Sequence, residues 1–341
     1  MRAIEYSHTG SADVLTMVNR EPPTPGPGEV VVRIAVSGVN PTDWKSRQGA
    51  GDGATLPRAQ VPNQDGAGVV ESVGSGVTSV SPGDRVWVWD AAYQRADGTA
   101  QELALLPALQ VVPLPAGVSF DVGASLGIPT LTAHRALTAR EGGPDELAPG
   151  TLAGAVVLVA GGAGAVSHAA IQLAVWAGAT VITTISSAEK ATLAAAAGAA
   201  HVLDYKTDDV AARVREVAPH GVDVIVEVNP VANLRLDLDI LALGGTVAMY
   251  AGVGTDEPSI PVRAAMGKNA RLQFLLTYST SPAQKAAAVR AVSAAAADGV
   301  LGVGEDNGLP LLRFPLERTA DAHLAVENNA VGKVLIDVAA L

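Results

Sequence analysis

The segment VVLVAGGAGAVSH, from Val156 to His168, joins an apolar β-type run to a glycine-rich turn. A helical pattern from Ala169 to Ala177 follows directly. In such a strand–turn–helix unit the glycines let backbone amides approach a phosphate, and the helix presents its positive end to the negative charge. A glycine-rich turn alone is a weak signal, so the flanking strand and helix carry the argument. We therefore predict a binding site for the pyrophosphate of a dinucleotide.

Composition limits the other possibilities. The 341 residues suffice for two domains, and the apolar residues (48%) form no uninterrupted run long enough to cross a bilayer. The net charge of −11 comes without a lysine and arginine cluster, so neither nucleic acid nor a membrane is an expected partner. The N-terminal MRAIEY shows no secretion signal, which leads us to expect a cytoplasmic protein.

The chain contains no cysteine, which excludes disulfides, thiol catalysis and cysteine-held zinc. Its six histidines lack the paired spacing of metal ligands, so we interpret them as packing or surface residues. No metal site is predicted.

The first third of the chain is rich in short apolar strands broken by proline and glycine. The predicted strands cover 29–39, 68–74 and 85–89. Closely spaced strands with such turns favour a compact β-barrel domain.

From about Thr130 the pattern changes to alternating strands and helices, which predicts parallel βαβ units in a doubly wound sheet. After the glycine turn and its helix, the predicted strands are 180–184, 201–203, 222–227 and 246–250, and the predicted helices are 188–197, 210–217 and 232–243. The C-terminal part adds a helix over 282–297 and a strand over 333–338. Its other segments are expected to fold back onto the N-terminal domain.

The second strand of the predicted sheet ends without the acidic residue that binds the ribose hydroxyls of NAD. Its tip carries Ser186 and Ser187, and Lys190 follows in the first turn of the next helix. Hydroxyls, helix amides and an ammonium attract a 2′-phosphate, whereas a carboxylate would repel it. The alternative is that Ser187 only caps the helix and Lys190 is solvated. We favour the first interpretation and predict NADPH as the cofactor.

Loosely defined motifs follow one another along nearly the whole chain. They are GVNPTD at 38–43, PNQDGAGVV at 62–70, VTSVSPGDRV at 77–86, the turn and helix at 161–171, AAHVLDY at 199–205 and GKVL at 332–335. In this order they resemble the medium-chain dehydrogenase/reductase superfamily, specifically its zinc-free quinone oxidoreductase (zeta-crystallin-like) branch.

The resemblance implies an α/β protein of two domains. A GroES-like β-barrel domain would comprise residues 1–128 and 269–341, and a Rossmann domain with a doubly wound parallel sheet would comprise residues 129–268. The active site is expected in the cleft between them. A homodimer or homotetramer is also expected, often built through the Rossmann domain.

The resemblance also implies site residues. Asn40 and Thr132 match positions beside the nicotinamide, and Asn329 lies near a position that closes on the cofactor. The predicted cofactor-binding residues are Thr132, Gly162, Ala163, Gly164, Ala165, Val166, Ser186, Ser187, Lys190, Tyr205, Asn229, Gly252 and Asn329.

The chain departs from the pattern at several positions. Ser167 replaces the last glycine of the turn, and its small side chain predicts a slightly displaced helix with binding retained. Zinc-dependent relatives carry a cysteine where Asn40 stands, so we expect a metal-free mechanism. Trp44 and Lys45 replace tyrosines that are often found there, so the substrate pocket is expected to differ.

Hydride transfer from a nicotinamide needs no Lewis acid when the acceptor is already electron-poor. The protein must donate hydrogen bonds to the oxygen on which charge develops, and we assign Asn40 as this donor. Asp43 either relays a proton or orients its loop by accepting amide hydrogen bonds. Asp65 is expected to brace the site, with Arg85 as its partner.

The sequence thus predicts an NADPH-dependent quinone oxidoreductase. An enoyl or 2-alkenal reductase remains open, because the same hydride geometry serves an enone and the pocket comes from scattered loops. A non-catalytic NADPH-binding protein is the third possibility. The expected substrate is a small quinone or enone.

Overall fold

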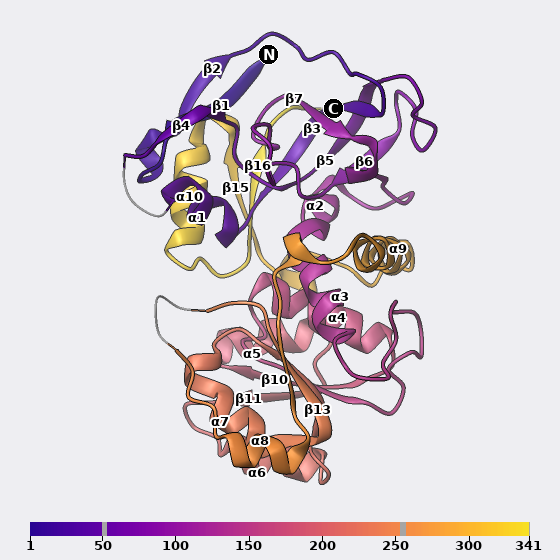
Figure 1. The fold of residues 1–341 in the computed structure, drawn as a ribbon, viewed down its shortest axis with the longest axis vertical. Helices are drawn as coiled ribbons and strands as arrows, with labels where there is room; N and C mark the ends of the chain where they lie inside the picture. The colour runs from indigo at the N-terminus through magenta and orange to yellow at the C-terminus, as the bar shows by residue number, and fades with distance from the viewer. Residues whose placement is uncertain (50–52, 253–256, 341) are drawn as a thin grey trace. The chain divides into compact units, whose positions relative to one another are not determined.

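The computed structural model describes residues 1–49, 53–252 and 257–340, and it contains two compact units (Figure 1). Unit 1 comprises Met1–Ile128 with Pro310–Leu341, and unit 2 comprises Pro129–Leu309. Residues 269–309 therefore belong to unit 2, and not to the N-terminal domain as expected from the sequence. They do so because strand β14 (Arg271–Phe274) pairs with a neighbouring strand in the unit 2 sheet. Helix α9 (Pro282–Ala297) also packs against α3 (Leu131–Leu137) of the same unit.

Unit 1 is a mainly antiparallel β structure that corresponds to the GroES-like domain. One sheet has the strand order β15-β16-β3-β5-β6-β8, with β7 paired to β3, and a smaller sheet has the order β2-β1-β4. The strands are β1 (Arg2–His8), β2 (Thr16–Asn19), β3 (Glu29–Val39), β4 (Thr55–Gln60), β5 (Asp65–Val73), β6 (Arg85–Val88), β7 (Leu103–Pro107), β8 (Val111–Pro113), β15 (Leu311–Pro315) and β16 (Lys333–Asp337). The helices are α1 (Pro41–Gln48), α2 (Phe120–Gly123) and α10 (Thr319–Glu327).

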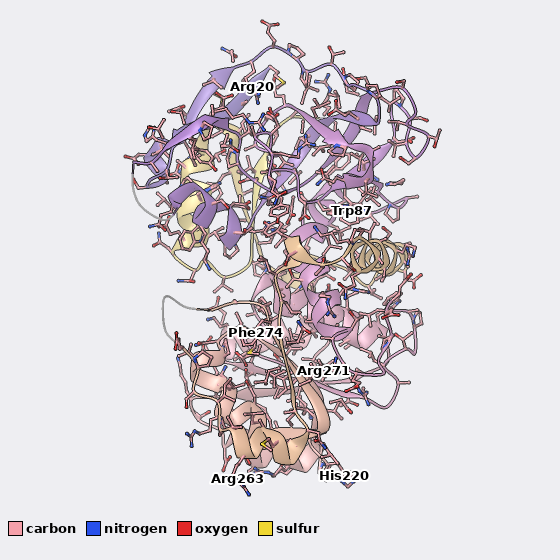
Figure 2. The ribbon with its side chains drawn as sticks, in the orientation of Figure 1. Arg20, Trp87, His220, Arg263, Arg271 and Phe274 are labelled. Atoms are coloured by element: carbon pink, nitrogen blue, oxygen red, sulfur yellow. The ribbon has the colours of Figure 1, made fainter. Side chains whose placement is uncertain are left out.

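Strand β3 is the centre of unit 1. Its sequence EVVVRIAVSGV is almost continuously apolar, and it pairs with β16, β5 and β7. The aliphatic core around Val30, Val32 and Ile34 is fully buried, and Trp87 of β6, which Figure 2 labels, is buried as well. The carboxyl end of β3 leads directly into Asn40 and α1.

Unit 2 is a parallel six-stranded sheet of order β11-β10-β9-β12-β13-β14 with flanking helices, as in a Rossmann domain. Its strands before β14 are β9 (Val156–Val159), β10 (Thr180–Ile185), β11 (His201–Asp204), β12 (Val222–Glu227) and β13 (Leu241–Met249). Its other helices are α4 (Ala165–Trp176), α5 (Ala188–Ala196), α6 (Val210–Val217), α7 (Pro230–Ile240) and α8 (Val262–Lys268). The runs VVLV, TVITTI and VDVIVE are rich in valine and isoleucine because these strands are covered on both faces.

The predicted elements agree with the observed ones except at some boundaries. Helix α7 ends at Ile240, three residues before the predicted end, because Leu241 already has extended geometry and pairs with Val222. Within residues 1–49, 53–252 and 257–340, every helix falls short of the length and hydropathy needed to cross a bilayer.

Candidate functional site

The glycine turn lies at the carboxyl end of β9, the central strand of the unit 2 sheet. The chain order reverses here, since β10 follows on one side of β9 and β12 lies on the other. Ligands of doubly wound sheets bind at such a switch point. Gly161 has a φ of 67°, and a Cβ added to Gly162 would lie 2.3 Å from the Thr183 Oγ1 atom. The turn therefore requires glycine at both positions, which keeps its backbone uncovered.

Helix α4 begins immediately after the turn, with Gly164 as its N-cap. In the first turn of α4, the N–H of His168 donates to the Gly164 carbonyl at 2.7 Å. The geometry of a helix end leaves the N–H groups of Ala165, Val166 and Ser167 directed outward, where they can bind a pyrophosphate. The predicted strand–turn–helix unit is present in full.

Ser167 occupies the position of the third glycine, and its side chain is buried. Its hydroxyl donates to the carbonyl of Ala160 at 2.8 Å and lies 3.2 Å from the Tyr250 hydroxyl. The serine hydroxyl thus bonds the helix to the end of β9.

The residues predicted to bind the 2′-phosphate lie together at the ends of β10 and β11. Lys190 Nζ donates to Ser186 Oγ at 3.3 Å, and the Lys190 N–H donates to Ser187 Oγ at 3.3 Å. Tyr205 follows β11, is 55% exposed and donates its N–H to the Ile185 carbonyl at 3.1 Å. Ser187 is therefore an N-cap, as the alternative interpretation proposed, and its neighbours still converge as the phosphate interpretation requires.

The other predicted cofactor residues of unit 2 follow neighbouring strands or lie on α3. Asn229 is the N-cap of α7 directly after β12, and Gly252 follows β13 in an exposed position with open space beside it. The Thr132 hydroxyl on α3 is hydrogen-bonded to the Thr277 hydroxyl, and both side chains are buried. The uncovered turn, the outward amides and the Lys190 cluster fit a phosphorylated dinucleotide.

Two buried carboxyl groups lie near Asn229, those of Glu227 at the end of β12 and Asp237 on α7. Neither was predicted from the sequence. Glu227 accepts hydrogen bonds from the Asn229 N–H and, at 3.0 Å, from Asn233 Nδ2. Asp237 on α7 is 2% exposed. Burial, and secondly the charge of Glu227, raises the pKa of Asp237 to about 9, so this carboxyl group keeps its proton at neutral pH.

Replacing Asp237 with asparagine is expected to reduce the slope with which the free energy of unfolding falls as pH rises from 6 toward 9. Because the pKa is about 9 in the folded protein and 3.8 as a reference value, the unfolded chain releases a proton that the folded protein keeps. The free energy of unfolding therefore falls as pH rises through this window, by at most about 1.4 kcal/mol per pH unit for one group. Denaturant unfolding between pH 6 and 9.5 measures the slope for both proteins.

The matched control is Asp239→Asn, because the Asp239 side chain is 55% exposed on the same helix and forms an ion pair with Arg215. This variant should keep the wild-type slope. An identical slope in Asp237→Asn and wild type would show that Asp237 does not hold the proton.

In unit 1, Asn40 lies at the carboxyl end of β3 and is 2% exposed. Its Nδ2 atom donates to Asp65 Oδ2 at 2.7 Å, and its Oδ1 atom accepts from Lys333 Nζ at 2.7 Å. Lys333 and Asp65 are themselves almost fully buried, and Lys333 Nζ lies 4.0 Å from Asp65 Oδ2. The asparagine thus stands between a buried cation and a buried carboxylate.

Asp43, the other predicted catalytic residue, is 3% exposed. Its Oδ2 atom accepts the N–H of Asn40 at 2.7 Å, which is the loop-orienting role considered for it. Burial, and secondly the charge of Asp65, raises the pKa of Asp43 to about 8. Burial raises the pKa of Asp65 to about 6 against the opposing effect of Lys333. At neutral pH, Asp65 is therefore the ionised member of the two.

The predicted Asp65–Arg85 pair is wrong: Asp65 accepts from Asn40 and the Ile128 N–H, whereas Arg85 donates to the Val118 carbonyl at 2.7 Å. Arg85 also lies over the Phe120 ring, 4.4 Å from its centroid. Asn329 follows α10 in an exposed turn with a φ of 58°, a conformation that asparagine tolerates.

Comparisons with known proteins agree with this arrangement. A family model described as an alcohol dehydrogenase GroES-like domain matches residues 26–116, and one described as a zinc-binding dehydrogenase matches residues 165–294. A quinone oxidoreductase from Rattus norvegicus is 31% identical over 347 residues, covering 98% of this chain and 97% of that protein. The chain belongs to the medium-chain dehydrogenase/reductase superfamily, in its quinone oxidoreductase branch.

Solved structures support the same assignment for this medium-chain dehydrogenase/reductase. An Escherichia coli quinone oxidoreductase complexed with NADPH is 26% identical with a TM-score of 0.79, covering 99% of this chain and 100% of that chain. An NAD-dependent alcohol dehydrogenase is 27% identical with a TM-score of 0.83, covering 99% of this chain and 100% of that chain. This superfamily member is an NAD(P)-dependent oxidoreductase.

Zinc is named in one matching family description. In the part of the chain that the structure describes, no group of three or more histidine, aspartate or glutamate side chains is arranged to hold a metal ion. The metal-free mechanism rests on the cysteine-free sequence and stays a prediction for this oxidoreductase.

Proposed function

We propose that this protein is an NADPH-dependent quinone oxidoreductase that transfers hydride directly to an electron-poor acceptor without a metal ion. The single observation that supports the cofactor choice is the cluster of Ser186, Ser187 and Lys190 at the tip of β10, where NAD-binding folds place a carboxylate. The quinone assignment is supported by the full-length relatives.

The residues of unit 2 have distinct binding roles in this proposal. The amides of the turn and of the first turn of α4 bind the pyrophosphate, and Lys190 with its serines binds the 2′-phosphate. Tyr205 offers an exposed ring beside them. Asn229, Gly252 and Thr132 border the nicotinamide end. When bound, NADPH supplies the hydride.

Unit 1 supplies the polar groups for the acceptor in this proposal. An asparagine amide carries two N–H donors, and Asp65 accepts one of those of Asn40. The second N–H is the group we assign to the oxygen on which negative charge develops. Asp43 holds the Asn40 backbone through its accepted N–H bond, so we assign it a positioning role rather than a proton transfer.

A panel of quinones and enones tests this function in the purified protein, with NADPH oxidation as the measured quantity. Turnover of quinones, unchanged after incubation with a chelator, is the expected result. Preference for enones would instead identify the alkenal reductase. Tight NADPH binding without turnover on any acceptor would identify a non-catalytic binding protein, and loss of turnover with the chelator would reveal a metal requirement.

The protein is also proposed to form a homodimer through the β14 edge, from which a homotetramer can be built. Strand β14 ends the sheet, and Phe274 on it is 63% exposed (Figure 2). Nearby in sequence, Leu276 is 61% exposed, and Val262 and Met266 of α8 are 61% and 68% exposed. A second copy related by a twofold axis presents the same edge and the same apolar side chains, so the surface is self-complementary.

Light scattering coupled to size-exclusion chromatography tests this interface. Phe274→Asp is expected to convert the dimer to monomer, because it places a charge among the apolar side chains. Leu109→Asp, which changes a 76% exposed leucine of unit 1, is the matched control and should leave the mass unchanged. A monomeric wild type, or an unaffected Phe274→Asp variant, would contradict the proposal.

A further inference from the structure

Three neighbouring strands of unit 1 bring Asn40, Lys333 and Asp65 together. Strand β3 runs between β16 and β5, with Val334 opposite Val39 and Asp65 opposite Gly38. Lys333 therefore lies on one side of Asn40 and Asp65 on the other, although 293 residues separate Lys333 from Asn40 and 25 separate Asp65 from it. The register of the sheet, and no local motif, creates this arrangement.

The two neighbours have opposite hydrogen-bonding properties. Lys333 Nζ donates to Asn40 Oδ1 at 2.7 Å and to the Val39 carbonyl at 3.1 Å. Asp65 accepts from Asn40 Nδ2 at 2.7 Å and from the N–H of Ile128. An ammonium only donates and an ionised carboxylate only accepts, so each can bind only one end of the amide.

An asparagine amide has nearly the same shape when its oxygen and nitrogen exchange places. Rotation by a half turn would direct the Asn40 NH₂ group at the ammonium and its oxygen at the carboxylate. Both contacts would be repulsive, and at exposures of 2% for Asn40, 1% for Lys333 and 0% for Asp65 no solvent would relieve them. One orientation is therefore strongly selected.

We propose that Lys333, acting with Asp65, is a positioning residue that fixes the amide orientation of Asn40 and so determines that an N–H, and not the carbonyl oxygen, is available to the acceptor. This inference rests on the proposed function of Asn40 as a hydrogen-bond donor. Without the selection, part of the protein would present an oxygen to the developing negative charge, and turnover would fall. Binding of the cofactor phosphates, which the proposal assigns to unit 2, would not change.

Lys333→Met tests the proposal kinetically, because methionine has a similar length and cannot donate. We expect kcat with a quinone to fall about 10- to 100-fold, as when a reacting group is misplaced, while the Kd for NADPH stays within about twofold. In an Asn40→Ala background, Lys333→Met should cause no further loss, since its effect passes through Asn40. Wild-type kcat in Lys333→Met, or losses that multiply in the double variant, would overturn the proposal.

A spectroscopic measurement keeps the test independent of turnover. In protein labelled with ¹⁵N-asparagine, the Nδ2 signals of Asn40 are identified by their loss in Asn40→Ala. Wild type should show one pair of signals protected from solvent exchange, and Lys333→Met should show a second pair or lost protection. An unchanged pair would overturn the proposal. Should wild type reduce no acceptor, only the proposed function fails, and this measurement still decides the orientation.

Lys333→Gln covers the case in which Lys333→Met does not fold. Glutamine can donate or accept, so position 333 keeps a polar side chain without selecting an orientation. The loss of the lysine charge, which lowers the pKa of Asp65, also favours a protonated Asp65 carboxyl group that can donate as well as accept. Two sets of Asn40 signals are then expected, and a single protected set would overturn the proposal.

Discussion

Lys190→Ala is expected to weaken NADPH binding by about 10- to 100-fold and NADH binding by less than about twofold. The size follows from the loss of one charge-assisted contact to the 2′-phosphate, about 1.5–3 kcal/mol, a contact that NADH lacks. Lys190 is half-buried beside Ser186 in the structure, so its ammonium is held at the tip of β10. Titration of both cofactors by fluorescence gives the two dissociation constants.

The matched control is Lys268→Ala, which makes the same change in net charge at the opposite end of the sheet. Lys268 Nζ donates to the Leu241 carbonyl, at the start of β13. This variant should bind both cofactors as wild type does. Equal losses for NADPH and NADH in Lys190→Ala would remove the structural basis for the NADPH preference.

Gly162→Ala is expected to weaken both cofactors together, by about 10- to 100-fold, and to lower the melting temperature. The added Cβ would lie 2.3 Å from Thr183 Oγ1 and 3.1 Å from Thr183 Cγ2. Thr183 cannot rotate away without losing its hydrogen bond to the Val159 carbonyl, at 2.7 Å. The turn must shift instead, and overpacking of this kind costs about 1–3 kcal/mol. Cofactor titration and thermal unfolding measure the two effects.

A second substitution distinguishes this clash from a general effect of alanine. Thr183→Ala removes both Thr183 atoms and leaves only the Ala194 Cβ, at 3.2 Å, close to the added Cβ, so the double variant should recover much of the lost binding. Gly267→Ala on α8 is the control, because its Cβ would meet no atom within 4 Å. Failure of the double variant to recover would show that the backbone freedom of Gly162, and not the space beside it, is what binding requires.

The sequence was informative wherever a structural rule acts over a few residues. The glycine turn, the helix after it and the capped start of α5 all follow from neighbouring side chains, and each lies where it was expected. Helices 210–217 and 282–297 were predicted to the residue. Parallel strands bring their carboxyl ends to one edge, so Ser186 and Lys190 at the end of β10 lie at the same edge as the glycine turn, whereas Tyr205 was expected there only from the family resemblance.

Local patterns were insufficient where partners come from distant strands. Arg85 was predicted to pair with Asp65, but β3 places Asn40 beside that carboxylate and α2 provides Arg85 with an aromatic ring. The sequence predicted no role for the side chains of Lys333 and Asp237, because lysine and aspartate are almost never buried unless they are paired. Their pairing depends on strand register and on the packing of α7, which no short motif encodes.

The amino-acid sequence by itself determined the fold class and the position of the glycine turn, since both depend on short-range backbone preferences and side-chain chemistry. Only the tertiary structure decided that residues 269–309 complete unit 2 and that Lys333 and Asp65 hold Asn40 between them. Those contacts exist because sheet pairing brings separate parts of the chain into register, and burial then makes each unpaired charge too costly to leave alone.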